Sequence, residues 1–500
     1  MNKQLRRLAL VLALLYVALF AMLNYTQVVR ADEYNSAPDN TRPIVRDFSQ
    51  PRGLITSADG VVLAESIPSD DRYELQRTYP TKDLFAHITG YFSFKYGTEG
   101  VERQYNDELA GQTDELRLAG WQEWFKDDRN TGDVQLTLRA DIQQAAKKAL
   151  GDREGSVVVM DPRTGAILAL WSWPSYDPNL LSTHDFKAAD AARALLLKDP
   201  RKPLLANAYQ ERYMPGSTFK IVTTTAGLES GVVTPETTYP IEREFTPPLT
   251  TDPIQNYNRL QCGGVLIDVF RRSCNTSFAR MSLDVGAEQM VRASEAFGFN
   301  QDVPIDLPRP AKSFFPSVEY FKGNDPLLAI DGFGQGDTTS TPLQMALTAA
   351  AVANRGQIMR PYVMAGIRDA SGRLVYHSTP SPWRQVMAQS TVDFLTSAMV
   401  EVVNNGTARC CMQLASGQQA AAKTGTAELG TDPPLSHAWI TTFAPAEAPR
   451  VVVTVMVKAT PEVSAGTGGT VAGPVAKKVL DMVLALPEPL TISPASSSTG

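Results

Sequence analysis

The sequence predicts an α+β protein in which helices pack against a largely antiparallel sheet. Two strand-like runs at 156–161 and 166–173 are followed by a long, mostly helical section that extends to about residue 400. Three further strand-like runs and a closing helix, at about 471–486, complete the pattern. Runs of strands and runs of helices in this order are typical of α+β folds and differ from the alternating pattern of βαβ proteins.

Composition indicates a globular protein with a large core. The chain has 500 residues, 43% hydrophobic and 20% charged, which allows about two to four domains. Its net charge of −6 argues against nucleic acid as a partner. The chain has four cysteines and four histidines, with no Cys-x-x-Cys or His-Glu-x-x-His spacing, so no metal site is predicted. No cofactor motif is present either.

An apolar run near the N-terminus predicts a membrane anchor. Three basic residues within 1–7 precede the run at 8–23, which residues 22–29 extend. Positive charge before a span places residues 1–7 in the cytoplasm and the rest of the chain outside. A cleaved signal peptide is the alternative. Since no small-x-small cleavage site directly follows the run, we predict a retained anchor over 8–29.

Residues 30–132 are predicted to form a small non-catalytic α+β module, the first part of which, at about 30–50, is a polar linker. Residues 52–64 are expected to form a hairpin around the turn Asp59-Gly60. Residues 97–102 are expected to form a turn that leads into a helix.

Residues 133–487 are predicted to form the main domain. A strand at 136–138 leads to a helix at 141–150, and the turn at 162–165 joins the first two main strands into a hairpin. The later strands are expected at 421–427, 437–444 and 450–460. Residues 488–500 are rich in serine and proline and are predicted to be a disordered tail.

Four cysteines allow three pairings, and the compartment outside the membrane permits disulfides. Cys262 and Cys274 flank a short loop and can bridge it. Cys410 and Cys411 are adjacent, and a bond between neighbours is strained, so these two are expected to stay reduced. Four free thiols are the alternative.

One short segment, residues 215–220 (PGSTFK), joins a Pro-Gly breaker to an apolar run and predicts a helix from about Ser217. Residues three apart share a helix face, so Ser217 and Lys220 place a hydroxyl beside an amine. Free N–H groups at the helix start favour negative charge, and a desolvated lysine can take the serine proton. Alone, such a pair is more often a helix cap and a solvated lysine.

Two later segments favour a catalytic role for Ser217 and Lys220 over a helix cap and a solvated lysine. Ser273-Cys274-Asn275 is the only Ser-x-Asn sequence, and residues 423–428 (KTGTAE) contain the only Lys-Thr-Gly sequence, on a predicted strand. Each alone is a weak signal. In this order, and in these structural contexts, they predict three distant segments that converge so that one hydroxyl lies between two amines.

Together the three segments resemble the active-site motifs of penicillin-binding proteins and serine β-lactamases. Over nearly the whole chain the sequence resembles the class B penicillin-binding proteins, and within them an actinobacterial subgroup. Further likeness lies in residues 2–7, 27–29, 52–55, 100–102, 174–179, 334–336, 341–344 and 437–439. This resemblance implies a transpeptidase domain with an antiparallel sheet, flanking helices and a helical subdomain. It also implies an N-terminal pedestal or dimerisation-type module and one transmembrane helix.

The activity implied by the resemblance is a serine D,D-transpeptidase that cross-links peptidoglycan outside the membrane. Its donor is a stem peptide ending in D-Ala-D-Ala, and β-lactams would acylate the same serine. Ser217 would be the nucleophile and Lys220 its general base, with Ser273 relaying a proton to the leaving amine. Asn275 would hold Lys220 and the substrate amide, and Lys423 would keep Lys220 neutral.

The third motif would bind the terminal carboxylate, through Thr424, Gly425 and Thr426. The N–H groups of Ser217 and Thr426 would form the oxyanion hole. The resemblance also favours a Cys262–Cys274 bond. Expected partners are a membrane glycan polymerase of the SEDS type and division proteins, since the chain has no glycosyltransferase region of its own.

Three alternatives share these motifs. A D,D-carboxypeptidase would use water as its acceptor, and a non-catalytic β-lactam-binding or scaffold protein would form the adduct and go no further. A β-lactamase would need a base that activates water, for which Glu401 and Asn405 have a suitable spacing, although they also end a predicted helix. His437, beside the third motif, could act as an acid or base or could be a strand-end histidine that makes one hydrogen bond, and it is given no role.

Overall fold

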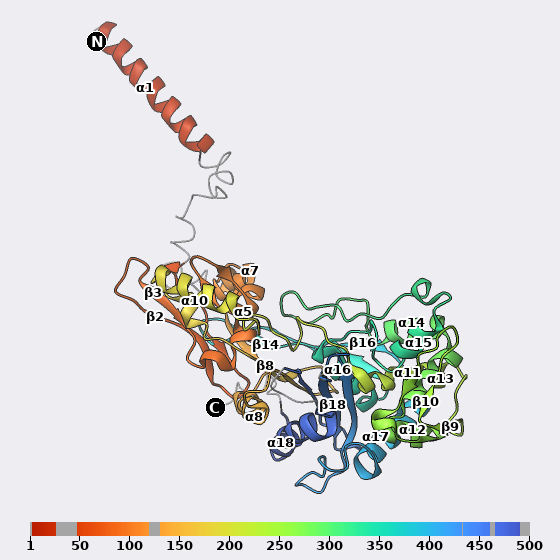
Figure 1. The fold of residues 1–500 in the computed structure, drawn as a ribbon. Helices are drawn as coiled ribbons and strands as arrows, with labels where there is room; N and C mark the ends of the chain where they lie inside the picture. The colour runs from red at the N-terminus through yellow and green to blue at the C-terminus, as the bar shows by residue number, and fades with distance from the viewer. Residues whose placement is uncertain (1–2, 27–47, 120–130, 433, 461–465, 491–500) are drawn as a thin grey trace. The chain divides into compact units, whose positions relative to one another are not determined.

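The computed structural model describes residues 3–26, 48–119, 131–432, 434–460 and 466–490 (Figure 1). The chain divides into two compact units, residues 1–51 with 67–76, and residues 52–66 with 77–500.

The first unit contains helix α1 (Lys3–Asn24), which is long and apolar enough to cross a membrane. Its most apolar window has a mean hydropathy of 2.1, and none of its residues is buried against the protein. The helix begins before the predicted anchor at 8–29 and includes the basic residues. Residues 27–29 and most of the predicted linker at 30–50 lie outside the described residues.

The second unit is built on a five-stranded antiparallel sheet in the order β17-β18-β19-β7-β8. Its strands are β7 (Gly155–Met160), β8 (Ile167–Trp173), β17 (Ala421–Glu428), β18 (Ser436–Ala444) and β19 (Val451–Val457). The predicted α+β class and the β7–β8 hairpin are confirmed, and Gly165 takes a φ of +84° in the hairpin turn. Every residue of β7, β18 and β19 is buried.

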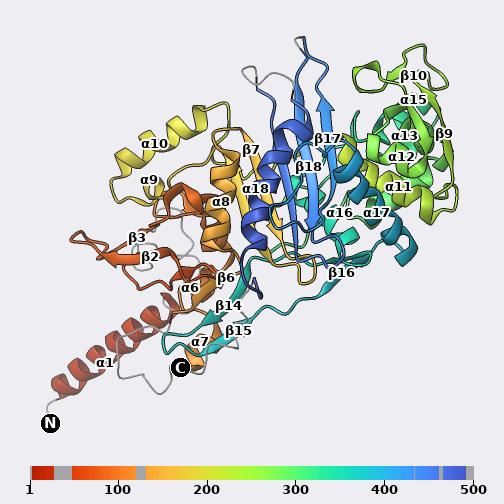
Figure 2. The same cartoon turned by 90° about the horizontal axis from the view of Figure 1, so that it is seen from below.

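Helices cover both faces of this sheet, which explains the apolar strands. Helices α8 (Ala140–Leu150) and α18 (Gly473–Leu484) pack together on one face, as Figure 2 shows. Helix α16 (Pro342–Ala353) packs against β7, β18 and β19 from the other face, and its first eleven residues are buried. Helix α17 (Gln389–Asn405) packs against β17, and the short π-helical turn η7 (Gly468–Ala472) leads into α18.

The predicted helical section is largely confirmed between residues 216 and 353. Its helices are η4 (Gly216–Phe219), α11 (Lys220–Glu229), η5 (Tyr257–Arg259), α12 (Leu266–Arg272), α13 (Asn275–Val285), α14 (Ala287–Ala296), η6 (Glu319–Phe321) and α15 (Asp325–Asp331). Short strands β9 (Thr238–Glu242) and β12 (Cys262–Val265) pair with each other, as do β10 (Glu244–Phe245) and β11 (Ile254–Gln255).

Between residues 354 and 388 the helical prediction is wrong, because four strands lie between α16 and α17. They are β13 (Gln357–Met359), β14 (Met364–Arg368), β15 (Leu374–His377) and β16 (Pro382–Gln385). Strand β13 pairs with β16, whereas β14 and β15 join the N-terminal module. These segments are short, and β14 also pairs with the distant strand β6.

The N-terminal module contains a second sheet, in which β15, β14, β6, β1 and β2 are neighbours. Its remaining elements are β1 (Ile55–Thr56), β2 (Val62–Pro68), β3 (Leu75–Thr78), η2 (Lys82–Leu84), α4 (Ala86–Thr89), β4 (Phe92–Ser93), β5 (Gly97–Thr98), α5 (Gly100–Gln104), α6 (Asn106–Leu109), α7 (Asp114–Ala119), β6 (Asp133–Leu136), α9 (Asn179–Ser182) and α10 (Phe186–Lys198). The predicted hairpin at 52–64 and the turn into a helix at 97–102 are confirmed. However, β6 and β14 belong to this sheet although both follow the predicted boundary at 132.

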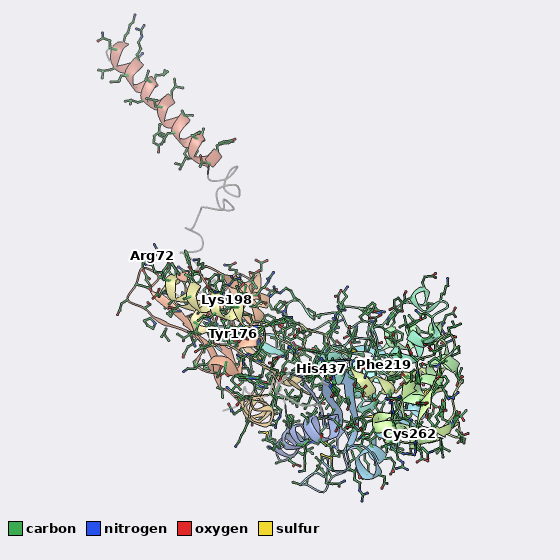
Figure 3. All side chains as sticks on the ribbon, in the orientation of Figure 1. Arg72, Tyr176, Lys198, Phe219, Cys262 and His437 are labelled. Atoms are coloured by element: carbon green, nitrogen blue, oxygen red, sulfur yellow. A yellow bond between two sulfur atoms is a disulfide. The ribbon has the colours of Figure 1, made fainter. Side chains whose placement is uncertain are left out.

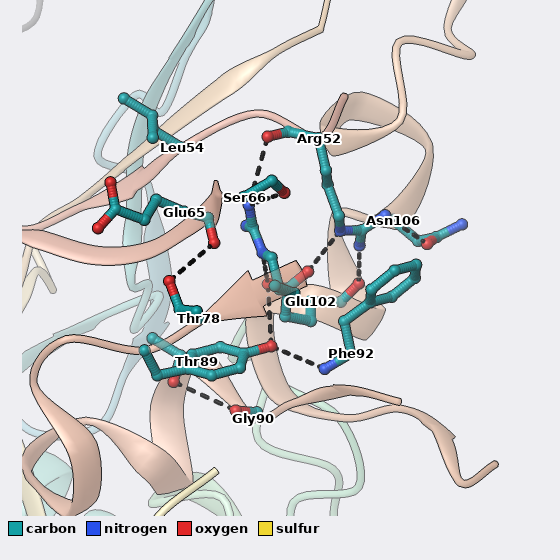
Figure 4. Close-up of polar contacts among 12 residues, drawn as sticks. Arg52, Leu54, Glu65, Ser66, Thr78, Thr89, Gly90, Phe92, Glu102 and Asn106 are labelled. Carbon is teal, nitrogen blue, oxygen red and sulfur yellow. Dashed lines mark hydrogen bonds and ion pairs between the residues drawn. The ribbon is translucent and has the colours of Figure 1, made fainter. Parts of the chain in front are cut away.

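A buried ionic network supports the module, as Figure 4 shows. Glu102 is completely buried and accepts hydrogen bonds from Arg52 Nε and Arg77 Nε, each at 2.6 Å. Tyr79 donates its hydroxyl hydrogen to the same carboxylate at 3.2 Å. Glu102 lies on α5, so its ion pair with Arg52 fixes the start of the module to this helix.

The predicted disordered tail begins too early. Glu488 forms an ion pair with Arg450, and Leu490 is buried at 1% exposure, so both residues belong to the folded unit. The rest of the predicted tail, residues 491–500, lies outside the described residues.

Candidate active site

The turn that carries Ser217 is fixed by its neighbours on both sides. A 3₁₀ turn, η4, begins at Gly216, and α-helix α11 follows from Lys220, so the predicted helix begins as a tighter turn. Gly216 has a φ of +52°, and a Cβ there would lie 2.8 Å from the carbonyl oxygen of Thr426, so only glycine fits. Phe219, labelled in Figure 3, stacks on Phe315 at 5.4 Å and anchors the turn in the core.

Lys220 points its amine at the second motif. The side chain is completely buried, and Nζ donates hydrogen bonds to the Ser273 carbonyl at 2.8 Å, Ser273 Oγ at 3.3 Å and Asn275 Oδ1 at 2.8 Å. Burial, and then the nearby charge of Lys423, lowers the pKa of the Lys220 amine well below its usual range. Among the described residues, no carboxylate forms an ion pair with it. Burial without a counter-ion favours the neutral amine, which can accept a proton.

Lys423 approaches the same serine from the opposite side. Its amine is also completely buried, and it donates to Ser273 Oγ at 2.8 Å and to the Thr424 carbonyl at 3.0 Å. Burial lowers the pKa of Lys423 to about 7. The predicted arrangement of one hydroxyl between two amines is therefore present, and the hydroxyl is that of Ser273.

Backbone geometry at the second motif places these groups. Ser273 has a left-handed conformation with φ 60° and ψ 44°, which ends α12 and directs Asn275 into the first turn of α13. Asn275 also donates from Nδ2 to the Gln255 carbonyl at 3.1 Å. A disulfide joins Cys262 to Cys274, with the Cα atoms 5.5 Å apart, and ties strand β12 to this motif.

A cleft of about 1020 Å³ runs over the three motifs. The predicted site residues that line it are Ser217, Ser273, Asn275, Thr424 and Thr426. Lys220 and Lys423 lie beneath its floor. Gly425 faces the Ser217 turn, where a Cβ would lie 2.8 Å from the Pro215 carbonyl oxygen. Ser217 Oγ is left free of side-chain hydrogen bonds within the described part of the chain.

The site also has a position for an oxyanion. The Thr426 carbonyl faces away from β18, since it accepts a hydrogen bond from Gln335 Nε2 at 3.3 Å and lies against Gly216. In an antiparallel strand the N–H and C=O of one residue point the same way. The Thr426 N–H therefore also faces the Ser217 turn.

Gly334-Gln335-Gly336, to which the sequence assigned no chemistry, connects the first and third motifs. The Gly334 carbonyl accepts from the Gly216 N–H at 2.8 Å, and a Cβ on Gly334 would lie 2.2 Å from the Gly216 oxygen. Gln335 reaches across to Thr426 as described above. The loop thus fixes the spacing between the nucleophile turn and β17.

Sequence reasoning missed Thr407 and Gln255, which also line the cleft. Thr407 Oγ1 lies 2.5 Å from Thr424 Oγ1. Thr407 follows the end of α17 without any motif around it, so its contact with Thr424 has no local signal. Gln255 contributes a backbone carbonyl, which no side-chain pattern reveals.

The alternative base and the other singled-out residues lie elsewhere. Asn405 donates to Glu401 at 2.8 Å at the exposed end of α17, and neither residue lines the cleft. His437 accepts one hydrogen bond, from the Ala459 N–H to Nδ1 at 3.0 Å, which fits the strand-end alternative, and burial lowers its pKa to about 4.

Cys410 and Cys411 are also bonded to each other, so the expectation that they stay reduced is wrong. The chain turns at 407–411, directly after α17, which brings the two sulfur atoms together. No free cysteine remains in the described residues.

Comparison with known proteins gives two family matches. The penicillin binding protein transpeptidase domain matches residues 155–481, and the penicillin binding protein A dimerisation domain matches residues 52–134. The peptidoglycan D,D-transpeptidase PbpA of Mycolicibacterium smegmatis is 36% identical over 97% of this chain and 99% of its own length. PbpA of Mycobacterium tuberculosis is 35% identical, with the same two coverages.

Solved structures agree. Penicillin-binding protein A from M. tuberculosis, as its ceftriaxone acyl-enzyme complex, superposes with a TM-score of 0.81 at 34% identity, over 88% of this chain and 100% of that chain. The penicillin G acyl-enzyme complex of the same protein has a TM-score of 0.79 at 33% identity, over 87% and 100%.

Proposed function

The chain belongs to the penicillin-binding protein transpeptidase family, and from this premise we propose how its residues carry out peptidoglycan D,D-transpeptidation. One observation carries the proposal: two buried lysines, which have no counter-ion among the described residues, meet at Ser273, which lines the same cleft as Ser217. The donor is a stem peptide that ends in D-Ala-D-Ala.

In the first half-reaction, Ser217 Oγ attacks the carbonyl between the two D-alanines. Neutral Lys220 takes the serine proton, and the tetrahedral oxyanion forms between the N–H groups of Ser217 and Thr426. Losing one such donor typically slows a reaction by about 10²–10³-fold. The C–N bond then breaks, the terminal D-alanine leaves, and an ester on Ser217 remains.

The proton reaches the leaving amine through Ser273. Once Lys220 is protonated, the Ser273 hydroxyl accepts from both lysine amines, at 3.3 Å and 2.8 Å, so its own hydrogen is free to point into the cleft. A proton that Lys220 has taken can pass to Ser273 Oγ while Ser273 gives its hydrogen to the departing nitrogen. Asn275 holds Lys220 in place for this transfer.

In the second half-reaction an amine of a neighbouring stem attacks the ester. Its proton returns to Lys220, and Ser217 regains its own as the C–O bond breaks. The buried positive charge of Lys423, with Thr424, Gly425 and Thr426, binds the donor's terminal carboxylate before the first step. β-Lactams carry an amide and a carboxylate in a similar relation, and we expect them to acylate Ser217.

The N-terminal helix anchors the protein in the membrane, with residues 1–7 in the cytoplasm and the catalytic domain outside. The basic residues at the start of α1 support this orientation. Residues 30–132, together with β6, β14 and β15, form the non-catalytic module, which offers a surface to a SEDS-type polymerase and division proteins.

The nucleophile is tested with a fluorescent penicillin. The wild-type protein should be labelled, Ser217→Ala should abolish the label, and a peptide map should place the adduct on Ser217. An adduct on another serine would contradict the assignment. Single-turnover reactions with and without an amine acceptor distinguish the transpeptidase from the carboxypeptidase and from a protein that only binds β-lactams.

A further inference from the structure

Thr407 presents a hydroxyl to the cleft next to the third motif. Its Oγ1 lies 2.5 Å from Thr424 Oγ1, and both residues line the cleft. The two side chains differ in exposure, because Thr407 is exposed whereas Thr424 is only 6% exposed.

The position of Thr407 is held by its neighbours. Its N–H donates to the Arg271 carbonyl at 3.3 Å. A Cβ on Gly406 would lie 2.4 Å from the Arg271 carbonyl oxygen, and a Cβ on Gly469 would lie 2.4 Å from the Thr407 carbonyl oxygen. Two glycines therefore allow the backbone on both sides to approach closely and fix the hydroxyl beside β17.

Counting protons shows what the pair can do. Two hydroxyls have two hydrogens, and one of them lies in the bond between the oxygens. The other hydrogen is free to donate to a ligand. Because Thr407 has the exposed side chain, Thr424 can donate to Thr407 while Thr407 donates into the cleft.

The charge beneath this position favours an anion. The buried Lys423 Nζ is next to Thr424, since it donates to the Thr424 carbonyl at 3.0 Å. Thr426 Oγ1 accepts from the Gly468 N–H at 3.5 Å, which leaves its own hydrogen available on the same wall. A carboxylate here would meet two hydroxyl donors and a cation.

We propose that Thr407 is a specificity-determining residue that donates its hydroxyl hydrogen to the terminal carboxylate of the donor peptide. The inference rests on the proposed function of this site. It predicts that Thr407 distinguishes a donor that ends in a carboxylate from one that ends in a neutral amide.

The test measures kcat/KM for an acyl-D-Ala-D-Ala donor and for its C-terminal carboxamide. A hydrogen bond to a charged group typically contributes enough for about a tenfold effect or more. Thr407→Val should therefore lose about tenfold with the carboxylate donor and remain unchanged with the carboxamide. Thr407→Ser, which keeps the hydroxyl, should recover the wild-type preference. Thr396→Val, a half-buried threonine earlier on α17, is the matched control and should change neither value.

Equal losses on both donors would assign Thr407 a structural role and overturn the inference, as would wild-type values for Thr407→Val on both. Failure of the proposed function gives a different result. In that case the wild-type protein itself would show neither penicillin labelling nor release of D-alanine, and the inference would fall with it.

Discussion

The molecule buries two clusters of cationic side chains and treats their charge in opposite ways. In the N-terminal module, Arg52 and Arg77 both contact the carboxylate of Glu102 (Figure 4). At the active site, Lys220 and Lys423 have only neutral hydrogen-bond partners among the described residues, with Ser273 Oγ between them.

This difference separates a structural role from a chemical one. Burial by itself would raise the pKa of Glu102, but Arg77 and Arg52 hold it below its usual value, so that network stays ionised. Burial lowers the pKa of both lysines, because no anion among the described residues offsets the cost of burying their positive charge. The ion pairs of Glu102 therefore hold two segments together, whereas the two lysines, which have no anion beside them among the described residues, supply a base near neutral pH.

The comparison predicts its largest effect for Lys220→Met. General bases typically contribute about 10²–10⁴-fold, so acylation by a fluorescent penicillin should slow by that factor. The variant should fold as well as the wild type, because an apolar side chain replaces a buried amine. Stopped-flow acylation and thermal unfolding check both statements, with the exposed Lys187→Met as the control. Near-normal acylation in a folded variant would rule out Lys220 as the base.

The next largest effect is expected for Glu102→Gln, which should lower the free energy of unfolding without changing the acylation rate. Glu102→Gln removes the carboxylate that the buried guanidinium groups of Arg52 and Arg77 share, and breaking such a network typically costs about 3–5 kcal/mol of unfolding free energy. Acylation per folded molecule should be unchanged. Denaturant unfolding measures the loss, and the exposed Glu115→Gln in the same module should have almost no effect. A stability like that of the wild type would show that the network is not needed for folding.

A smaller effect is expected in the pH dependence of stability, to which the two clusters contribute in different pH ranges. Lys423 has a folded pKa of about 7 against an unfolded value near 10.5, so the unfolded chain binds more protons between these values. Stability should therefore rise with pH across this window, by about 1.4 kcal/mol per unit for each such proton. Lys423→Met should remove the Lys423 contribution to this slope and leave that of Lys220. Glu102 changes stability in the same direction but in a lower pH window, because its stabilisation is present above its usual pKa of 4.5 and is lost as pH falls below it. Parallel pH profiles of unfolding for wild type and Lys423→Met would contradict the first statement.

Several features of the fold are predictable because their signals are local. The β7–β8 hairpin has its turn residues between two apolar runs, and α18 has an apolar face within one segment. In contrast, β14 pairs with β6 across more than half of the main domain, and nothing in residues 364–368 indicates that partner. The vicinal disulfide at Cys410 was similarly unpredictable, because it depends on the turn after α17.

The amino-acid sequence by itself determined the family, the reaction and the three motifs, because each motif places its residues within one helix turn, loop or strand. Tertiary structure alone decided which atoms meet. Lys220 and Ser273 are 53 residues apart and Lys423 and Ser273 are 150 apart, yet they share one hydrogen-bonded cluster. It also placed Thr407 beside Thr424 and joined Gly334 to the Ser217 turn. Such contacts form between segments whose separation carries no periodic signal, and only the packed core brings them together.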